Sequence, residues 1–350
     1  MRTPRRMPRR MPRRTPRHDH DRQVPMMTRD GRATHAWLYG AASVGLVCLA
    51  ACSLDSITSS SESFNWQAGT AVHLVTVGAR PRTYALHVPP KRLTSASVPV
   101  PWPLVIVLHG SSGDGVAIQN QSAMNALADS VLFLVAYPDA TGGEFGVYPS
   151  DWNAGTCCGG AYRDNVDDLA FITAIIAQTS SHVSVNARKV YVAGFSAGGR
   201  MAFHVGCQLS ASIAAIGVVS GSLVDAACVP RNSMPLIAIH GTEDPVVAFD
   251  EPAPPFPGAV PLAANALTPA TQFWTALYKC TGGTRTVAAP HVFRNRFSTC
   301  TSGTDIDFFT IGGGTHGWPG GPVDPGAQPP MNEIRASLLI WQFFTRHTHK

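Results

Sequence analysis

The stretch VYVAGFSAGGR, residues 190–200, joins a run of apolar residues to a cluster of glycine, alanine and serine. Its Gly194-x-Ser196-x-Gly198 pattern is typical of a serine nucleophile presented on a sharp turn between a strand and a helix. The same letters also fit an ordinary glycine-rich corner. The surrounding sequence therefore has to supply a strand before Ser196, a helix after it and partners for its hydroxyl group.

Five continuous apolar runs predict strands that are covered on both faces, as in a parallel sheet. Segments with helical patterns lie between and after these runs, so the chain is predicted to be an α/β protein with a mostly parallel central sheet and helices on both faces. The predicted strands are 103–110, 131–138, 189–195, 214–221 and 234–241, and the predicted helices are 165–180, 197–210 and the C-terminal 334–347.

The loops at the carboxyl ends of such strands are where α/β sheets bind their ligands. The segments 139–163 and 245–270 are rich in glycine and proline and follow predicted strands. Ser196 itself follows the predicted strand 189–195 and precedes a predicted helix. The opening motif thus has the strand, turn and helix that a nucleophile of this type requires.

A serine nucleophile needs a base and a group that orients the base, in the chain order serine, acid, histidine for this motif. The segment IAIHGTEDPVV ends a predicted strand with Glu243 and Asp244; Asp244 is preferred because it precedes a proline, and Glu243 is the alternative. His316, in the glycine-rich loop GGGTHGWPGG, is the predicted base. The other downstream histidines are His291, beside a proline, and His347 and His349 in the charged C-terminal tail.

Stabilisation of an oxyanion requires two N–H donors. The amide of Ala197, directly after the nucleophile, is one candidate. The loop in VIVLHGSSGDG supplies the other, with Ser111 preferred and Gly110 second. His109 is predicted to pack this loop without transferring protons, and His204 and His240 are predicted to be core residues.

The chain has 350 residues, and its formal charge of +5 arises in the leader. Residues 1–35 hold eleven Arg and three Asp, a net of +8, whereas the remainder holds 16 Lys and Arg against 19 Asp and Glu, a net of −3. A basic nucleic-acid-binding face is therefore not expected in the folded part.

An uncharged segment, residues 36–51, ends in Leu49-Ala50-Ala51-Cys52 and has the length of a signal-peptide core rather than a membrane span. The sequence around Cys52 resembles a bacterial lipoprotein box, and a plain secretory signal is the alternative. We therefore expect a leader at 1–51, a Ser-rich tether at 52–70 and a single catalytic domain at 71–350. The protein is expected to be exported, either extracellular or anchored in the cell envelope.

Eight cysteines are present, and six remain once Cys48 and Cys52 are assigned to the leader and the lipid anchor. An even number is expected in an oxidising compartment. Cys280 and Cys300 are predicted to pair with each other. The adjacent Cys157 and Cys158 are predicted to reach separate partners, with Cys207 and Cys228 as the candidates. The chain contains no C-x-x-C pair, and no metal site or other cofactor is expected.

Five motifs occur in one order: LHGSSGDG, DWNAGTCCGGAYRDNVDD, GFSAGG, IHGTEDPVV and GGGTHGWPGG. Together they resemble the secreted polyhydroxybutyrate depolymerase-like esterases, a family that also holds feruloyl and acetylxylan esterases, over roughly residues 71–345. The resemblance implies an α/β-hydrolase fold and a triad of Ser196, Asp244 and His316. The sequence departs from the family where Thr315 and Gly317 flank His316, since Gly-His-Thr-Trp-Pro is common there.

The resemblance implies a serine esterase that acts through an acyl-enzyme on hydroxyalkanoate oligomers or related esters. A feruloyl or acetylxylan esterase and a serine peptidase of the same fold are the alternatives. Trp152 and Trp318 are candidates for a substrate pocket, where an indole face could stack on a ring or a sugar. Beyond an ester substrate and a possible lipid anchor no partner is expected, and the protein is expected to be a monomer.

Overall fold

The computed structural model describes residues 66–90, 101–143, 149–225, 227–253, 268–322 and 332–349. The chain divides into two units, residues 1–60 and 61–350, and all described residues belong to the second. The predicted leader and the lipidation candidate Cys52 therefore lie outside the described residues. Within the described ranges, no helix has the length and apolar character needed to cross a bilayer.

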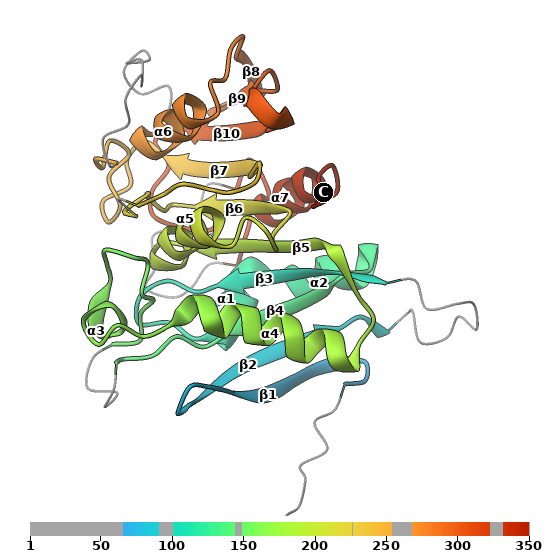
Figure 1. Cartoon of the computed structure of the whole chain (residues 1–350). Coiled ribbons are helices and arrows are strands. Elements are labelled where there is room, and N and C mark those ends of the chain that lie inside the picture. The colour runs from blue at the N-terminus through green and yellow to red at the C-terminus, as the bar shows by residue number, and fades with distance from the viewer. Residues whose placement is uncertain are drawn as a thin grey trace, which may run out of the picture. The chain divides into compact units, whose positions relative to one another are not determined.

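A single 10-stranded sheet forms the centre of the second unit, with the strand order β1-β2-β4-β3-β5-β6-β7-β10-β9-β8 (Figure 1). The strands from β4 to β10 in this order are parallel, whereas the pairs at both ends of the sheet are antiparallel. The strands are β1 (Gly69–Val77), β2 (Arg80–Val88), β3 (Trp102–Leu108), β4 (Leu134–Pro138), β5 (Val185–Phe195), β6 (Ala215–Val219), β7 (Leu236–Gly241), β8 (Thr284–Ala289), β9 (Val292–Phe297) and β10 (Ile306–Ile311).

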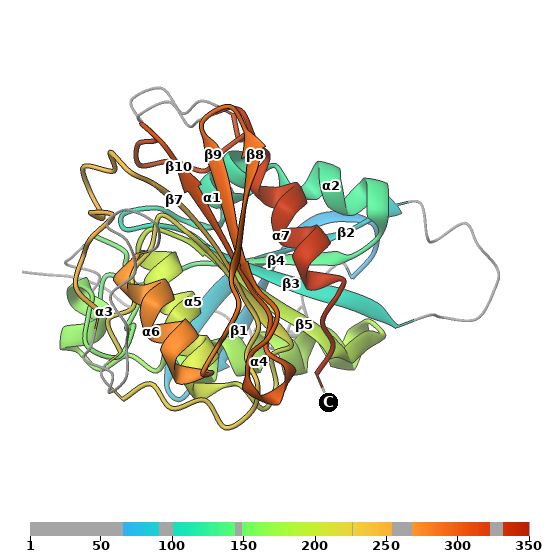
Figure 2. The same ribbon diagram turned by 90° about the horizontal axis from the view of Figure 1, so that it is seen from above.

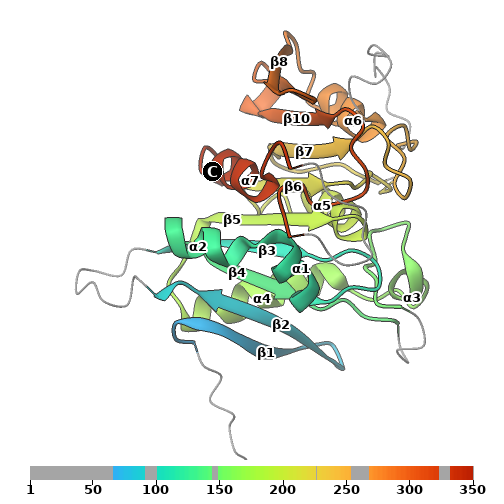
Figure 3. The same cartoon turned by 180° about the vertical axis from the view of Figure 1, so that it is seen from behind.

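Helices cover both faces of the sheet, as the apolar runs predict. Figures 1 and 2 show α4, α5 and α6 on one face, and Figure 3 shows α1, α2 and α7 on the other. Two separate clusters of buried side chains, one on each face, form the core. The helices are α1 (Gly115–Ser122), α2 (Met124–Val131), α3 (Gly159–Arg163), α4 (Asp168–His182), α5 (Ala197–Gln208), α6 (Pro269–Leu277) and α7 (Ala336–Phe344).

The strands predicted from apolar runs are β3, β4, β5, β6 and β7, and the α/β fold with a mostly parallel sheet is confirmed. The antiparallel strands at the two ends were not predicted. Residues of β1 alternate in burial and those of β8 are mostly exposed, while polar residues such as His87 interrupt the buried end of β2. β1 begins at Gly69, inside the stretch predicted as a tether.

Two neighbouring aspartates at the start of helix α4 have different roles. Asp167 is the N-cap, and its side chain accepts a hydrogen bond from the amide of Ala170. Asp168 is buried, and its carboxylate pairs with Arg82 of β2 at 2.8 Å and accepts a hydrogen bond from the amide of Asn153. Asp168 therefore ties α4 to the sheet and to the loop after β4.

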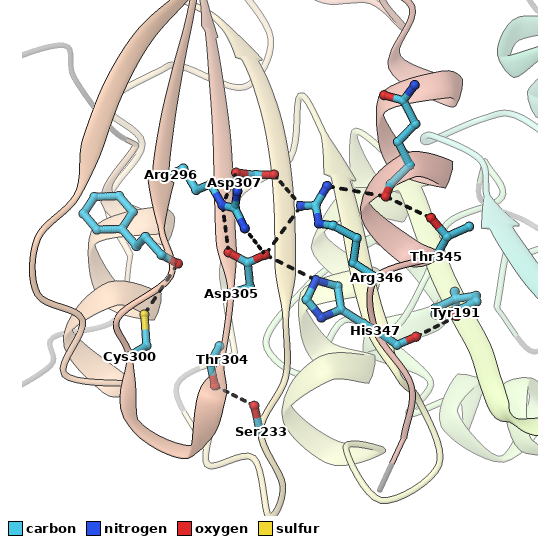
Figure 4. Close-up of polar contacts among 12 residues, drawn as sticks. Tyr191, Ser233, Arg296, Cys300, Thr304, Asp305, Asp307, Thr345, Arg346 and His347 are labelled. Carbon is cyan, nitrogen blue, oxygen red and sulfur yellow. Dashed lines mark hydrogen bonds and ion pairs between the residues drawn. The ribbon is translucent and has the colours of Figure 1, made fainter.

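A cluster of charged side chains joins the C-terminal segment to β9 and β10 (Figure 4). Nη2 of Arg346 lies 2.8 Å from Asp307 and 3.5 Å from Asp305, and His347 Nε2 lies 3.6 Å from Asp305. Arg296 of β9 pairs with the same two carboxylates at 3.4 and 4.0 Å. This cluster lies at the amino end of β10, because Asp305 directly precedes that strand.

Three disulfide bonds are present among the described residues. Cys280 and Cys300 are bonded to each other, as predicted. The prediction for the other four cysteines is wrong: Cys207 of α5 is bonded to Cys228, and the adjacent Cys157 and Cys158 are bonded to each other. The loop after β6 brings Cys228 beside the end of α5, so the adjacent pair has no separate partners left. Three disulfides indicate maturation in an oxidising compartment.

Candidate active site

Ser196 lies on a sharp turn between β5 and α5. Its backbone has φ 56° and ψ −117°, and its amide donates to the carbonyl of Val219 in the neighbouring strand β6 at 3.0 Å. A positive φ at a residue other than glycine is strained by about 1 to 3 kcal/mol and is found most often at functional sites. The turn thus lifts Ser196 to the carboxyl edge of the parallel strands.

The flanking glycines are required by close backbone contacts. A Cβ atom on Gly194 would collide with the backbone of Gly198, and a Cβ atom on Gly198 would collide with the carbonyl oxygens of Leu108 and His109. The first turn of α5 therefore packs directly on the end of β3. Only glycine allows this approach, which explains the motif at the level of atoms.

Asp244 and His316 lie against each other at the same edge of the sheet. Nδ1 of His316 is 2.8 Å from Oδ2 and 3.0 Å from Oδ1 of Asp244. The other ring nitrogen, Nε2, is thereby left to face a different group. Asp244 follows β7 and His316 follows β10, so two neighbouring parallel strands deliver the pair.

Burial alone would raise the pKa of Asp244, but hydrogen bonds outweigh it and hold that pKa well below its usual range. The imidazole of His240 lies 3.4 Å from the carboxylate, and the imidazole of His316 and the amides of Val247 and Val246 donate to it. The carboxyl group is therefore charged at neutral pH. Glu243, the alternative acid, is exposed.

The turn that carries Ser196 is in contact with the loop that carries His316. The ring of Phe195 packs on the imidazole of His316 with 4.8 Å between centroids. Ser220, directly after β6, donates from its hydroxyl group to the carbonyl of Gly317 at 3.3 Å. These contacts join the neighbours of Ser196 to the loop that carries His316.

His240 is buried at the end of β7, as predicted for a core residue, but it also takes part in this site. Its Nε2 donates to the carbonyl of Val247 at 2.8 Å and lies 3.4 Å from Oδ2 of Asp244. His240 thus fixes the turn that aims the carboxylate. The sequence feature that could have indicated this role is the position of His240 at the end of a strand, four residues before Asp244.

The loop after β3 lies beside Ser196. A Cβ atom on Gly110 would come within 3.2 Å of the Cβ atom of Ser196. The amides of Ser112 and Gly113 already donate to the carbonyls of Ser150 and Gly110. Ser111 donates from its hydroxyl group to Oδ2 of Asp151 at 2.9 Å, which holds the loop in place.

Ala197 begins α5, and the first amides of a helix have no acceptor within the helix. Its N–H and that of Ser111 therefore remain the candidates for receiving negative charge beside Ser196. His109 packs the loop as predicted: its Nδ1–H donates to the carbonyl of Gly110, and its Nε2 accepts from the amide of Ala140. These partners require a neutral ring, and burial lowers the pKa of His109.

The two tryptophans predicted to line a substrate pocket are buried, so that prediction needs correction. Trp152 is 0% exposed and donates from its indole nitrogen to the carbonyl of His109, whereas Trp318 is 1% exposed and donates to Ser337. Neither ring presents a face to a substrate. Each instead anchors a loop, the first beside Ser111 and the second directly after His316.

The remaining histidines have partners elsewhere. His291 is bound to Glu333, His347 to Asp305 and His349 to Asn232. His204, in the second half of α5, lies 2.8 Å from Asp225. Only His316 among these joins the carboxylate of Asp244 to the turn at Ser196.

A parallel sheet with helices on both faces, and with a strained serine between a strand and a helix at its carboxyl edge, defines the α/β-hydrolase fold. Solved structures agree. The chain is similar to an acetyl xylan esterase from Aspergillus awamori, with a TM-score of 0.52 and 14% identity over 78% of this chain and 98% of that one. It is also similar to a CE1 ferulic acid esterase from Anaeromyces mucronatus, with a TM-score of 0.51 and 14% identity over 81% and 91% of the two chains.

Within that fold the chain belongs to the family described as Esterase PHB depolymerase, whose model matches residues 82–258. It is 29% identical to the putative esterase NocK of Nocardia uniformis subsp. tsuyamanensis, over 73% of this chain and 75% of that protein. It is also 29% identical to feruloyl esterase B of Piromyces equi, over 61% of this chain but only 39% of the relative's length. Family membership identifies the chain as a carboxylic ester hydrolase.

Proposed function

We propose that the protein is an exported serine esterase with Ser196 as nucleophile, His316 as general base and Asp244 as the residue that orients the base. The observation that carries this proposal is the Asp244–His316 pair, 2.8 Å apart, beside a serine at φ 56°. A serine, an imidazole and a carboxylate are the three groups that acyl transfer by a serine requires, and this pairing supports the proposal.

The reaction follows from this arrangement. Nε2 of His316 takes the hydroxyl proton of Ser196 while Oγ forms a bond to the ester carbonyl carbon, and the carbonyl oxygen becomes an oxyanion. The amides of Ala197 and Ser111 receive that oxyanion, and each such donor contributes roughly 3 kcal/mol. The alcohol leaves with the proton from His316. Water then repeats the sequence on the acyl-enzyme and releases the acid and free Ser196.

The proposed substrates are hydroxyalkanoate oligomers or related esters, and the description of the family model supports this class. Feruloyl or acetylated polysaccharide is the second candidate, supported by the names of the relatives and fold neighbours. Proton transfer and oxyanion binding would be the same for both classes. A serine peptidase of the same fold is the third candidate and would use the same three residues.

A panel of substrates tests both the activity and its class. Hydroxybutyrate oligomers, methyl ferulate, acetylated xylan, short nitrophenyl esters and peptide anilides are offered to the wild type, to Ser196→Ala and to Ser130→Ala, an exposed serine of α2. We expect hydrolysis of the oligomers by the wild type and Ser130→Ala and none above background by Ser196→Ala. Preference for methyl ferulate or acetylated xylan would replace the substrate class, and preference for anilides would overturn the esterase proposal.

We also propose that Cys52 is lipidated after removal of the leader, so that the enzyme is anchored in the cell envelope as a monomer. The even number of cysteines paired within the described residues supports export. Labelling of the full chain with palmitate tests the anchor. The label should be lost in Cys52→Ser, and its persistence would leave an enzyme exported without a lipid.

A further inference from the structure

Arg200 lies in the first turn of α5, one turn after the proposed nucleophile. Its amide donates to the carbonyl of Ser196 at 3.0 Å. Side chains on a helix tilt toward its N-terminus, so the guanidinium group reaches back toward the carboxyl edge of the sheet. The side chain is 22% exposed, so it is partly accessible to solvent.

The guanidinium group of Arg200 contacts three loops. Its Nη2 donates to both carboxylate oxygens of Glu251, at 2.7 and 2.9 Å. Its Nε donates to the hydroxyl group of Ser222 at 3.1 Å, and its Nη1 lies 3.9 Å from Sγ of Cys158. These partners lie after β7, after β6 and at the start of α3, so one side chain of α5 joins three loops at this edge.

Glu251 belongs to the loop after β7 that also carries Asp244, which we call the acid loop (residues 242–253). One end of the acid loop is fixed by His240, through the carbonyl of Val247, and by the two amides that Asp244 accepts from. The other end is fixed to α5 by the pair of Arg200 and Glu251. The acid loop is therefore held at both ends, and the second contact ties it to the helix that carries Ser196.

Arg200 could instead bind an anionic group of a substrate, but its contacts argue against that role. The charge of Glu251 already neutralises the guanidinium group, and Ser222 occupies Nε. A substrate carboxylate would have to displace Glu251 from two short hydrogen bonds. These contacts favour a role of Arg200 in holding the loops together over a role in binding substrate.

We propose that Arg200 is a positioning residue. By binding Glu251 it holds the acid loop, and with it the Asp244–His316 pair, in the correct position relative to Ser196. This inference rests on the proposed function of those three residues. Displacement by about 1 Å of a group far from the chemistry can lower a rate by about a hundredfold. Loss of the Arg200–Glu251 pair should therefore lower kcat and leave KM nearly unchanged.

The test is a double-mutant cycle with Arg200→Ala, Glu251→Ala and the double variant, assayed on a short, uncharged nitrophenyl ester. We expect each single variant to lose on the order of tenfold in kcat, with KM within about twofold of the wild type. The double variant should be no slower than Arg200→Ala, because both single changes break the same pair. Arg200→Lys, which keeps the charge but loses the separate contact from Nε to Ser222, should fall between the wild type and Arg200→Ala.

The pH profile separates a positioning role from a merely stabilising one. His316 faces Asp244, and Asp244 faces His240, so the acid limb of kcat/KM reports how well the carboxylate supports the imidazolium. The double variant removes one positive and one negative charge, so the net charge near the site is unchanged. A shift of its pH–rate profile therefore reflects a change in the position of the carboxylate rather than a change in charge. If the carboxylate moves away, the acid limb should shift to lower pH by about half a unit or more.

Two controls complete the experiment. Arg188→Ala removes an exposed arginine of β5 that donates to the carbonyl of His349, and it should leave kcat unchanged. All rates are measured well below each variant's melting temperature. Wild-type kcat in Arg200→Ala, or fully additive losses with an unmoved acid limb, would overturn the positioning role. Full activity of Ser196→Ala would instead overturn the proposed function itself.

Discussion

Asp244 is the residue on which most of the site's contacts converge. Its two oxygens accept from the imidazole of His316 and two backbone amides and lie 3.4 Å from the imidazole of His240, and these contacts hold its pKa well below the usual range despite burial. A group with a lowered pKa stays charged throughout the neutral range. The acid limb of the rate profile should therefore not report the titration of Asp244.

Replacing Asp244 with asparagine should keep the volume of the side chain but remove its charge. The imidazole of His316 then loses the carboxylate that fixes its tautomer and stabilises its protonated form. We expect kcat to fall by about a thousandfold to ten-thousandfold with little change in KM. Steady-state kinetics on a nitrophenyl ester measure this. Glu243→Gln, an exposed neighbour, is the control, and a larger loss in that variant would show that the wrong acid has been assigned.

At this scale the sequence predicted Ser196, Asp244 and His316 from motif order, and the structure brings them to one edge of the sheet. It could not predict the roles of His240, Arg200 and Glu251. Their partners lie on other elements, and no local pattern encodes those contacts. It also misjudged Trp152 and Trp318, because an aromatic residue in a loop looks the same whether the loop folds inward or outward.

The contact between α5 and the end of β3 is the element-level feature on which the turn at Ser196 depends. Gly198 lies against the carbonyl oxygens of Leu108 and His109, so no side chain fits there. The same contact sets the distance between the nucleophile and the loop that carries Ser111. The turn at Ser196 and the loop that carries Ser111 therefore form one packed unit.

Gly198→Ala should disturb both stability and activity. The added methyl group must push α5 away from β3, and such overpacking costs about 1 to 3 kcal/mol of unfolding free energy. Separation of the two elements should also lower kcat by at least tenfold. Urea unfolding and ester hydrolysis measure the two effects. Gly312→Ala, whose new atom would have only ordinary contacts, is the control; an equal effect there would contradict this account of the turn.

At the element scale, the buried parallel strands could be predicted because continuous apolar runs bounded by turn residues are typical of strands covered on both faces. The antiparallel strands could not, since β8 is mostly exposed and reads like a polar loop. Disulfide pairing could be predicted only for Cys280 and Cys300. The pairing of the other four depends on where the loop after β6 lies, which is a tertiary feature.

In the whole second unit, the site and the charged cluster of Figure 4 occupy opposite ends of the parallel strands. Burial alone would raise the pKa of Asp305, but the nearby imidazole of His347, 3.6 Å away, and the guanidinium groups of Arg296 and Arg346 outweigh it and lower that pKa to about 2. The cluster thereby attaches the C-terminal segment to the sheet, away from the chemistry.

Asp305→Asn should therefore affect stability rather than catalysis. The pKa in the folded state is below the reference value of 3.8, so the stabilisation is complete above that value and is lost as the pH falls through about 2. We expect the variant to lose about 1.5 to 3 kcal/mol of unfolding free energy at pH 7. The difference from the wild type should shrink below about pH 4. Urea titrations at pH 7, 4 and 2.5 measure it, and a difference that grows toward low pH would contradict the assignment.

The central claim is that Ser196 is a nucleophile activated by His316, and covalent labelling tests it most directly. The wild type, Ser196→Ala and His316→Ala are treated with a fluorophosphonate, and the modified peptide is identified by mass. The account predicts one label per wild-type chain, located on Ser196, no label in Ser196→Ala, and labelling slower by at least a hundredfold in His316→Ala. Equal labelling of the wild type and Ser196→Ala, or a label on another residue, would contradict it.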